Sequence, residues 1–505
     1  MKHIALIFLF SIACFILPSS APVSSESISS SSFYAPHAPI NIVNDSELAA
    51  VATSGSGSEN NPFILENWDI LARDIHGISI ANTTAFFIIQ NCWIVANGVP
   101  GVHGIFLENV ADGSAVIFNN ICQNTDFGIF LINSTGSRIL SNLCKASNEG
   151  IYLDHSGNST VANNDCQRST MNGIAIMHSA NSTVTDNLCR QSDSAGILFR
   201  NSSNSIVSDN FLYECGFFVV EDSLTHYLSY SIANTWVNSQ PLGWFTNEAN
   251  MTVSSPYGAI ALINCTNVLV TNQNCSNADD GISVLYSSDC QVIRNTFSYH
   301  DWMGIFVWKS DSIFVANNTC IQNRFRGIYL LESVECIVTN NTCSQAPGGW
   351  WGGGYGIALS SSYSCEITYN KLSENLLYGI YLGQSDGNGI HHNSFLFNNN
   401  GETQASDDGS HNLWYDPTGP EGNYWSDYSG SGAYQIDGSA GANDSFPLAH
   451  APLYSPLASS QGADSRAFGD LPLELLGLTI LVLIIILGLV LVLGFVLGLV
   501  WEIIK

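Results

Sequence analysis

Residues 317 to 330 read NNTCIQNRFRGIYL, and this arrangement recurs along most of the 505-residue chain. An Asn-x-Cys stretch is followed, seven residues after the Cys, by Gly and then by apolar, variable and apolar residues. When the chain is aligned on this Gly, six of the twelve intervals are 23 residues, a period typical of stacked repeats. The anchors are Gly77, Gly104, Gly128, Gly150, Gly173, Gly196, Gly216, Gly258, Gly281, Gly304, Gly327, Gly356 and Gly379.

Each repeated unit contains two or three short segments in which apolar and polar residues alternate, separated by Gly, Asn and Ser. One unit cannot bury its apolar face, but stacked units can, because their strands pair in parallel with the next rung. The segment before residue 471 has no helical periodicity, and it lacks the Leu-rich consensus of leucine-rich repeats. The sequence therefore predicts an all-β, right-handed parallel β-helix of about twelve rungs, roughly 58 Å long.

The alternation also predicts which side chains face the core. In Gly-Ile-x-Leu the two apolar residues point inward and the middle residue points outward. The recurrent Asn, such as Asn318, is expected at a turn, with its amide bonded to the Asn one rung away. The Cys two residues later interchanges with Leu and Phe, which indicates a buried position. We therefore expect mostly buried free thiols, with a few disulfides as the alternative and no zinc cluster.

Both ends of the chain carry membrane signals. Residues 1–25 have a basic start, an apolar run and small residues, as a secretory signal peptide does. Residues 471–501 are almost unbroken Leu, Ile, Val and Gly, which predicts one transmembrane helix. Twelve Asn-x-Ser/Thr sequons are typical of an exported glycoprotein. The sequence therefore predicts a single-pass protein with its ectodomain at the cell surface and its last residues in the cytoplasm.

Departures from the period divide the chain into expected regions. A leader, the first part of the β-helix and an insertion occupy residues 26–54, 55–220 and 221–257. The second part of the β-helix, a cap, and a Ser- and Pro-containing stalk occupy residues 258–400, 401–448 and 449–470.

Acidic residues outnumber basic residues by 42 to 14, and the formal net charge is −28. Nucleic acid is therefore excluded as a partner, because so few basic residues cannot neutralise phosphates. Cations, uncharged glycans and proteins remain as candidate partners.

Three stretches, together with the rungs, resemble the NosD-type family of parallel β-helix proteins. They are GSGSENNPFILENWDI (55–70), NTWVNSQPLGWF (234–245) and NLWYDPTGPEGNYWSDYSG (412–430), and the resemblance covers about residues 55–448. It implies the domain shared by carbohydrate-binding proteins and sugar hydrolases, which is common on archaeal cell surfaces.

The resemblance also suggests two metal ions, copper and calcium, as candidate ligands. Name-giving members help to deliver copper to nitrous oxide reductase, but the Met residues here are few and the histidines, including the His391-His392 pair, are scattered. Many relatives end in an Asp-Gly-Asp-Gly run that suggests calcium, whereas this chain reads GSGAYQIDGSAGANDSFPL there. We therefore predict no cofactor and no metal site, with calcium and copper as the alternatives.

Aromatic residues occupy the outward position in seven rungs, and such rings suit the apolar C–H faces of sugars. Alternatively, they stabilise neighbouring rungs across strands or lie under a covering loop. A Gly-rich insertion, SQAPGGWWGGGY (344–355), adds two Trp on a loop that is either a binding tip or a simple bulge. The ligand-binding candidates are Phe106, Phe130, Tyr152, Phe218, Phe306, Tyr329, Tyr381, Arg324, Arg326, Trp350 and Trp351.

One acidic cluster on the outer face is a candidate catalytic site. Asp279 and Asp280 precede Gly281, and His300-Asp301 stands one rung further on. Stacking would bring these groups and the two arginines of the next rung within about 10 Å of each other. Two carboxyl groups could then act as acid and base in glycoside hydrolysis. The Gly-His-Gly motif of polygalacturonase-like sites is absent, however, and polar residues also precede Gly simply because a turn lies there.

The favoured hypothesis is a non-catalytic surface protein that binds glycans or neighbouring cell-surface proteins. The alternatives are a membrane-tethered polysaccharide hydrolase or lyase and a copper-handling protein.

Overall fold

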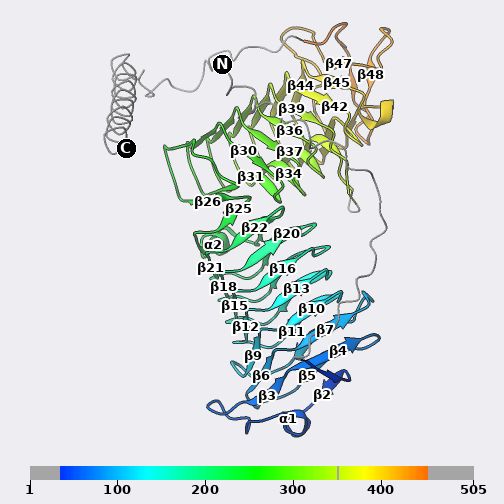
Figure 1. The fold of residues 1–505 in the computed structure, drawn as a ribbon. Coiled ribbons are helices and arrows are strands. Elements are labelled where there is room, and N and C mark those ends of the chain that lie inside the picture. Colours follow the sequence, from blue (N-terminus) through cyan, green and yellow to red (C-terminus); the bar gives the residue numbers. More distant parts are fainter. Residues whose placement is uncertain (1–33, 350–351, 453–505) are drawn as a thin grey trace, which may run out of the picture. The chain divides into compact units, whose positions relative to one another are not determined.

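The alternating segments of the repeat form strands that stack into an all-β parallel solenoid of about 15 turns (Figure 1). The computed structural model describes residues 34–349 and 352–452. The predicted signal peptide, the predicted transmembrane helix, and Trp350 and Trp351 lie outside the described residues. Within the described part of the chain, no helix is long and apolar enough to span a membrane.

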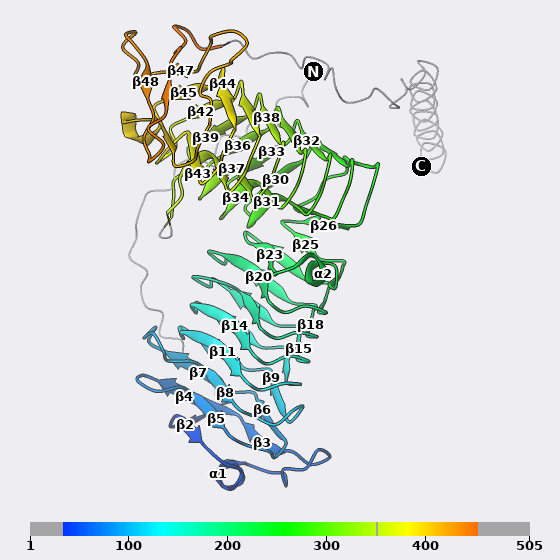
Figure 2. The same cartoon turned by 180° about the vertical axis from the view of Figure 1, so that it is seen from behind.

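The solenoid has two segments, and each segment has three parallel sheets (Figures 1 and 2). The Gly-Ile-x-Leu strands form one sheet in each segment, which we call the first and second platform sheets. The first platform sheet contains β2 (Ile40–Ile42), β5 (Ile78–Ala81), β8 (Ile105–Glu108), β11 (Phe127–Ile132), β14 (Glu149–Asp154), β17 (Ile174–Met177), β20 (Ala195–Arg200) and β23 (Gly216–Val220). The second contains β26 (Gln240–Thr246), β28 (Ala259–Ile263), β31 (Asp280–Leu285), β34 (Met303–Trp308), β37 (Arg326–Leu331), β40 (Tyr355–Ser360), β43 (Ile380–Gly383) and β46 (Ala405–Asp407).

The remaining strands complete the walls of each segment. In the first segment, the Asn-Cys strands form a sheet that we call the cysteine sheet: β1 (Ala35–His37), β4 (Trp68–Ala72), β7 (Trp93–Ala96), β10 (Ile121–Gln123), β13 (Leu143–Lys145), β16 (Asp165–Gln167), β19 (Leu188–Arg190), β22 (Phe211–Tyr213) and β25 (Trp236–Val237). Its third wall contains β3 (Phe63–Glu66), β6 (Phe87–Gln90), β9 (Ala115–Phe118), β12 (Arg138–Leu140), β15 (Thr160–Ala162), β18 (Thr183–Thr185), β21 (Ile206–Ser208) and β24 (Ser231–Ala233).

The second segment is completed in the same way. One wall contains β27 (Thr252–Val253), β29 (Leu269–Thr271), β32 (Gln291–Ile293), β35 (Phe314–Ala316), β38 (Ile337–Thr339), β41 (Glu366–Thr368) and β44 (Gly389–His391). The other contains β30 (Asn274–Ser276), β33 (Thr296–Ser298), β36 (Thr319–Ile321), β39 (Thr342–Ser344), β42 (Lys371–Ser373), β45 (Ser394–Leu396) and β47 (Tyr424–Trp425). The short elements outside these walls are α1 (Asp45–Val51), α2 (Leu224–Tyr227), η1 (Asn399–Gly401), β48 (Tyr434–Gln435) and β49 (Asn443–Asp444).

The count of about 15 turns corrects the predicted twelve. Strands β2, β26 and β46 pair in register with repeat strands although no Gly anchor precedes them. The backbone hydrogen bonds of a parallel ladder do not depend on side chains, so end turns that lack the signature still join the stack. Residues of the expected leader and of the expected insertion thus contribute strands to the solenoid.

A ladder of buried Asn side chains runs through the first segment. The backbone N–H and the side-chain amide of Asn142 both donate to Oδ1 of Asn164, at 2.9 and 3.0 Å. Asn164 makes the same pair of bonds to Asn187, at 2.9 and 3.0 Å. The predicted rung-to-rung Asn bond is confirmed. The left-handed conformation, however, belongs to the residue before each Asn, such as Asn163 with a φ of 59°.

The cysteines lie in the core, as the interchange with Leu and Phe predicted. Cys122, Cys144, Cys166 and Cys189 stand in register on successive strands of the cysteine sheet. All 13 cysteines in the part of the chain that the structure describes are buried and unpaired. The prediction of free core thiols is therefore confirmed for these residues.

The chain reverses its direction between the two segments. Strands β25 and β26 pair antiparallel across a tight connection at Asn238 and Ser239, both with positive φ. The cysteine sheet therefore continues into the second platform sheet, and together they form one 17-stranded sheet. Nothing in the repeat pattern predicted this reversal.

The reversal places the outer face of the second platform sheet against the end of the first segment. Ala259, Ala261 and Ile263 of β28 belong to the core cluster of the first segment, whereas Ile260 and Leu262 belong to the second core. Aromatic rings make further contacts, such as Phe217 with Trp244 at 5.9 Å. Residues that an isolated solenoid would expose are therefore buried at this junction.

Candidate functional site

A row of aromatic rings covers the outer face of the first platform sheet. Phe106, Phe130 and Tyr152 are paired in register on β8, β11 and β14, and neighbouring ring centroids are 5.1 and 5.3 Å apart. Phe127 extends the row because its ring lies 5.0 Å from that of Tyr152. His103 in turn stacks on Phe127 at 4.9 Å. Phe127 and His103 were not among the predicted residues, since both precede the Gly anchor in a position expected to be a turn.

A cleft of about 930 Å³ begins at the Tyr152 end of this row. One wall is the outer face of the first platform sheet, with Tyr152, Leu198 and Phe218. The opposite wall is formed by turns of the second segment, with Trp302 and Phe325, whose rings stack at 5.0 Å. The junction between the two segments thus creates a groove with aromatic side chains on both walls.

Polar groups of both charges line the same cleft: Glu149, Asn172, Asp193, Arg200, Asp301 and Arg324. Burial raises the pKa of Glu149 to about 8, although its oxygens accept two hydrogen bonds from Asn172 at 3.1 Å. Burial likewise raises the pKa of Asp301 to about 7, an effect that the Arg324 guanidinium opposes and Asp193 reinforces. Near neutral pH these two acids can therefore hold a proton and donate a hydrogen bond.

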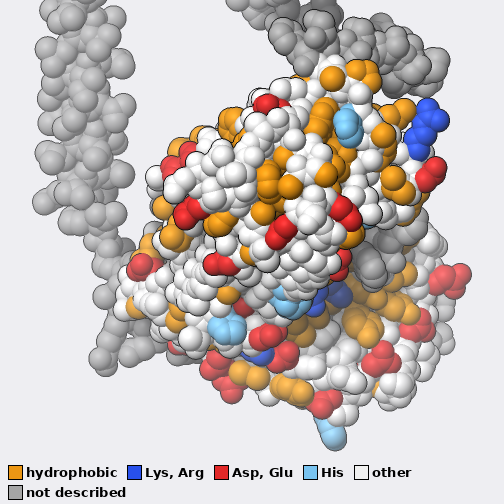
Figure 3. Space-filling view, turned by 90° about the horizontal axis from the view of Figure 1, so that it is seen from below, with side chains coloured by type: hydrophobic (Ala, Val, Ile, Leu, Met, Phe, Trp, Pro, Cys, Tyr) orange, Lys and Arg blue, Asp and Glu red, His pale blue; other side chains and the backbone are white. Residues whose placement is uncertain are grey.

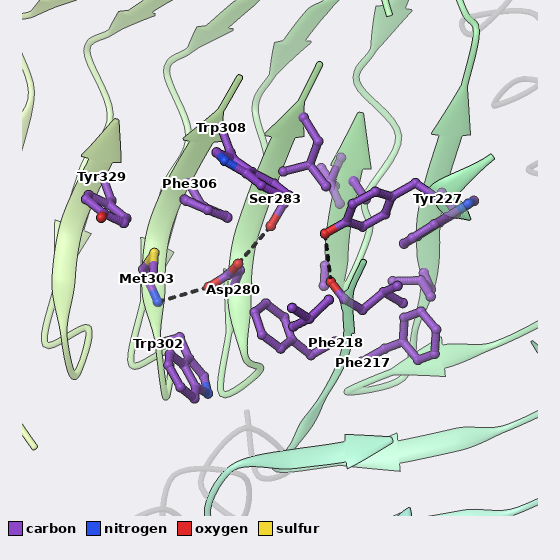
Figure 4. A pocket seen from close by; sticks show the side chains of 18 of the residues that line it. Phe217, Phe218, Tyr227, Asp280, Ser283, Trp302, Met303, Phe306, Trp308 and Tyr329 are labelled. Carbon is purple, nitrogen blue, oxygen red and sulfur yellow. Dashed lines mark hydrogen bonds between the residues drawn. The ribbon is translucent and has the colours of Figure 1, made fainter. Parts of the chain in front are cut away.

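A smaller, mostly apolar pocket of about 280 Å³ adjoins the cleft and shares Phe218 and Trp302 with it (Figure 4). Asp280 lies inside this pocket, where its carboxylate accepts hydrogen bonds from Ser283 Oγ at 2.7 Å and from the Met303 backbone N–H at 3.1 Å. Burial raises the pKa of Asp280 to about 7, while these two donors lower it.

The four predicted catalytic residues do not share one cavity. Asp280 lines the pocket and Asp301 lines the cleft, but Asp279 and His300 are each only 1% exposed. Burial lowers the pKa of His300 to about 4, and its ring nitrogens lie 3.3 and 3.2 Å from the carbonyl oxygens of Ala278 and Cys275. His300 thus points into the wall and not into a cavity.

The predicted ligand-binding residues are distributed over both platform sheets. Phe306 and Tyr329 line the pocket and stack at 5.6 Å. Arg326 lies 4.1 Å above the ring of Tyr329, and Arg324 lies in the cleft. Tyr381 stacks on Tyr355 further along the second platform sheet.

Among the residues that the structure describes, two groups of side chains could hold a metal ion, although none was predicted. Asp154, His155 and His178 form one group, and His391, His392 and Asp416 form the other, each with ligand atoms within 4.8 Å of one another. In the first group, both His Nδ1 atoms lie within 2.9 Å of Asp154 Oδ1. The spacing of 23 residues between His155 and His178, one period of the repeat, is the signal in the sequence that could have identified this group.

Acidic side chains are scattered over the surface that Figure 3 shows, where Lys and Arg are few. This distribution follows from the net charge of −28. A surface of this sign attracts cations and repels polyanions.

These features define a parallel β-solenoid protein with a cleft between its two segments. The chain belongs to the NosD family, described as "Periplasmic copper-binding protein (NosD)", whose profile matches residues 58–239 and 242–430. The group Asp154, His155 and His178 offers the imidazole and carboxylate donors that copper(II) and zinc accept. No curated protein matches the chain.

Several solved structures have a similar fold. The periplasmic alginate epimerase AlgG is 12% identical, and the match covers 75% of this chain and 84% of that chain with a TM-score of 0.28. The A-module of a mannuronan C-5 epimerase from Azotobacter vinelandii is also 12% identical, over 70% of this chain and 88% of that one, with a TM-score of 0.23. At this identity the similarity concerns the fold alone.

We expect the Asp279→Asn variant to be more stable than the wild type at pH 8, by about 1–3 kcal/mol. Both carboxyl oxygens of Asp279 are buried without a hydrogen-bond partner among the described residues. Burial, with Asp301 and Asp280 adding to it, raises the pKa of Asp279 well above its usual range.

The sign of the effect follows from proton linkage. The folded state holds the Asp279 proton more tightly than the unfolded state, so Asp279 costs stability as pH rises above the unfolded pKa of about 3.9. The gain from Asn should therefore shrink between pH 8 and pH 4 in urea-unfolding measurements. Asp186→Asn, at an exposed position, is the control. An equal gain at both pH values would contradict this explanation.

Proposed function

We propose that this protein binds oligosaccharides in the cleft between its two segments and does not cleave them. The observation that carries the proposal is the aromatic lining of both walls, with Tyr152 on one side and Phe325 on the other, while Phe218 and Trp302 stack on each other at 5.7 Å where the walls meet. Sugar rings present apolar C–H faces that pack on aromatic rings, and a groove with two such walls can hold a chain from both sides.

The polar lining supports a glycan rather than a purely apolar ligand. Arg200, Arg324 and Asn172 can donate hydrogen bonds to sugar hydroxyls, and Asp193 can accept them. Glu149 and Asp301, whose pKa values are raised by burial, can donate as well as accept near neutral pH. Arg324 is close enough to Asp301 to lower its pKa, and three acids line the cleft against two arginines, which favours uncharged glycans over polyanionic ones.

The aromatic row outside the cleft supports a ligand that extends over several rungs. From Phe106 to Phe218 the outward positions span six strands of the first platform sheet, or roughly 24 Å at about 4.8 Å per rung. Ala175 and Leu198 occupy two of these positions, so the row is interrupted near the cleft. A chain of several sugar units matches this length better than a monosaccharide does.

We also propose that the protein acts outside the cytoplasm, held at the cell surface by the predicted helix at 471–501. The predicted signal peptide and the sequons support this location, and so does the description of the NosD family as periplasmic. We further propose that the solenoid winds with a right-handed sense and that the cell surface is archaeal.

A second candidate function, cleavage of the bound glycan, is favoured by the raised pKa values of Glu149 and Asp301. An acid with a pKa near 7 is suited to protonate a leaving group at neutral pH. Both residues line the cleft that would hold the substrate. Asp301 is then the candidate acid, since Glu149 is held by Asn172 in the wall.

A glycan array with the purified protein tests the proposal, followed by affinity measurements on the best ligand. Tyr152→Ala is expected to weaken binding about tenfold or more, because a stacking ring contributes on the order of 1 kcal/mol beyond the area that it buries. Tyr363→Ala is the matched control, since Tyr363 is 42% exposed and lies outside the cleft. Equal affinity for the two variants would contradict the placement of the ligand.

A reducing-sugar assay on the same ligand separates binding from cleavage. Binding without release of oligosaccharides supports the first candidate. Release that is lost in Asp301→Asn, while affinity persists, would instead establish the protein as a hydrolase or lyase.

A further inference from the structure

Aromatic rings line several sides of the pocket beside the cleft. Phe218 of β23 and Tyr227 of α2 line it from the first segment, while Trp302, Phe306 and Trp308 line it from the second (Figure 4). The three rings of the second segment keep part of their surface exposed, so the pocket opens to the solvent. A cavity of about 280 Å³ with this lining accommodates a small organic molecule.

Asp280 gives this aromatic pocket a single acidic group. Within the described chain, the lining residues include no Lys, Arg or His. Asp279, the adjacent acid, supplies no positive charge either, and the electrostatic interaction with Asp280 is one cause of its raised pKa. Two cations lie outside the lining: Arg326, two rungs away in the same register, has its guanidinium over Tyr329, and Lys309 Nζ lies 4.6 Å from the centre of the Trp308 ring. No residue of the lining therefore neutralises an ionised Asp280.

The two hydrogen bonds of Asp280 orient its carboxylate but do not supply a counter-charge. Ser283 Oγ donates to Oδ2 and the Met303 N–H donates to Oδ1, so both oxygens are held while each retains a free lone pair. Both donors are neutral groups. An asparagine at position 280 could still accept a hydrogen bond from Ser283 Oγ or from the Met303 N–H. The hydrogen bonds between neighbouring rungs therefore do not by themselves require an acid here.

We propose that this pocket binds a small organic ammonium ion, with Asp280 as its counter-charge and the surrounding rings as its cage. The faces of aromatic rings attract cations, Trp most strongly, and the attraction increases when water is excluded. A methylated ammonium group combines positive charge with an apolar surface, which matches a pocket that is apolar except for one carboxylate. The net charge of −28 favours the approach of such a ligand.

The proposal does not depend on glycan binding in the cleft. The ammonium pocket and the cleft share Phe218, Val220 and Trp302, but Asp280 lines only the pocket and Tyr152 only the cleft. Loss of ammonium binding can therefore be distinguished from loss of glycan binding by the Asp280→Asn and Tyr152→Ala variants.

Isothermal titration calorimetry and tryptophan fluorescence on the full chain test the proposal with two probes. Choline carries a quaternary ammonium group, and 3,3-dimethylbutan-1-ol has nearly the same shape without the charge. We expect saturable binding of choline and at least tenfold weaker binding of the neutral alcohol. Asp280→Asn should weaken choline binding at least tenfold, and Phe306→Ala should weaken it severalfold.

The controls make each outcome decisive. Asp289→Asn removes an acid at an exposed turn of the second segment and should leave choline binding unchanged. Unchanged unfolding midpoints will show that the variants fold. Equal affinity for choline and the alcohol would overturn the proposal in favour of a purely apolar site. Unchanged choline binding in Asp280→Asn, or no choline binding at millimolar concentration, would also overturn it.

Discussion

Replacing Asn164 with alanine is expected to lower the free energy of unfolding by about 4 kcal/mol. Asn164 accepts two hydrogen bonds from Asn142, at 2.9 and 3.0 Å, and its own amide donates to the Ile139 carbonyl at 2.9 Å and to Asn187 Oδ1 at 3.0 Å. All of these atoms are buried inside the wall of the first segment. Alanine would leave the backbone N–H of Asn142 without its acceptor and would remove one hydrogen bond each from the Ile139 carbonyl and from Asn187 Oδ1, and water cannot replace these bonds.

Urea unfolding followed by circular dichroism measures this loss. Asn60→Ala is the control, because Asn60 is an exposed residue near the start of the solenoid. The control should change the free energy of unfolding by less than about 0.5 kcal/mol. A cost below about 1 kcal/mol for Asn164→Ala would show that the ladder adds little beyond the backbone pairing.

A methyl group at Gly150 is expected to destabilise the protein by about 3 kcal/mol or more. A Cβ atom at this position would lie 2.3 Å from the carbonyl oxygen of Gly173 and 3.0 Å from Cys166 Sγ. The first contact is with backbone of the next rung, which cannot move away without stretching the parallel ladder. The clash therefore has to be relieved by separating two rungs.

Two further variants test this explanation of the Gly anchor. Gly419→Ala should be nearly neutral, because a Cβ atom there would have no atom within 4 Å beyond its immediate chain neighbours. Combining Gly150→Ala with Cys166→Ala removes the contact with sulfur but not the contact with the carbonyl oxygen. The double variant should therefore remain unstable, and a return to wild-type stability would show that the thiol was the obstacle.

Much of the fold could be predicted because the repeat expresses it many times. The alternation in Gly-Ile-x-Leu placed Ile328 and Leu330 in the core, where both are fully buried. The interchange of Cys320 with Leu and Phe placed that thiol inside as well. Each of these patterns recurs on neighbouring rungs, so an accidental residue at one rung does not change the predicted orientation of the side chains.

The junction could not be predicted, because it occurs once. Asn238 and Ser239 are turn residues like many others in the chain, and nothing in their identity distinguishes a reversal from another corner of the solenoid. The candidate site depends on this reversal. Asp280 begins a repeat strand and Asp301 lies in the bend before one, positions that every rung has, and only the packing of the first segment against them creates the pocket and the cleft.

For the same reason the sequence could not show that the four predicted catalytic residues face different cavities or the inside of the wall. Rung spacing correctly placed Asp279, Asp280, His300 and Asp301 on neighbouring turns, but it did not determine which side of the wall each side chain faces. His300 turns inward to the carbonyl oxygens of Ala278 and Cys275, while Asp301 faces the cleft.

The buried thiols can report which rungs of this protein unfold locally. Cys92, Cys122, Cys144, Cys166 and Cys189 mark successive rungs of the first segment, and each is fully shielded from solvent. An alkylating reagent can reach one of them only when that rung opens, so the order of labelling, read by mass spectrometry, maps where local opening begins. The repeat thus contains its own set of position-specific probes, and no residue needs to be introduced to read them.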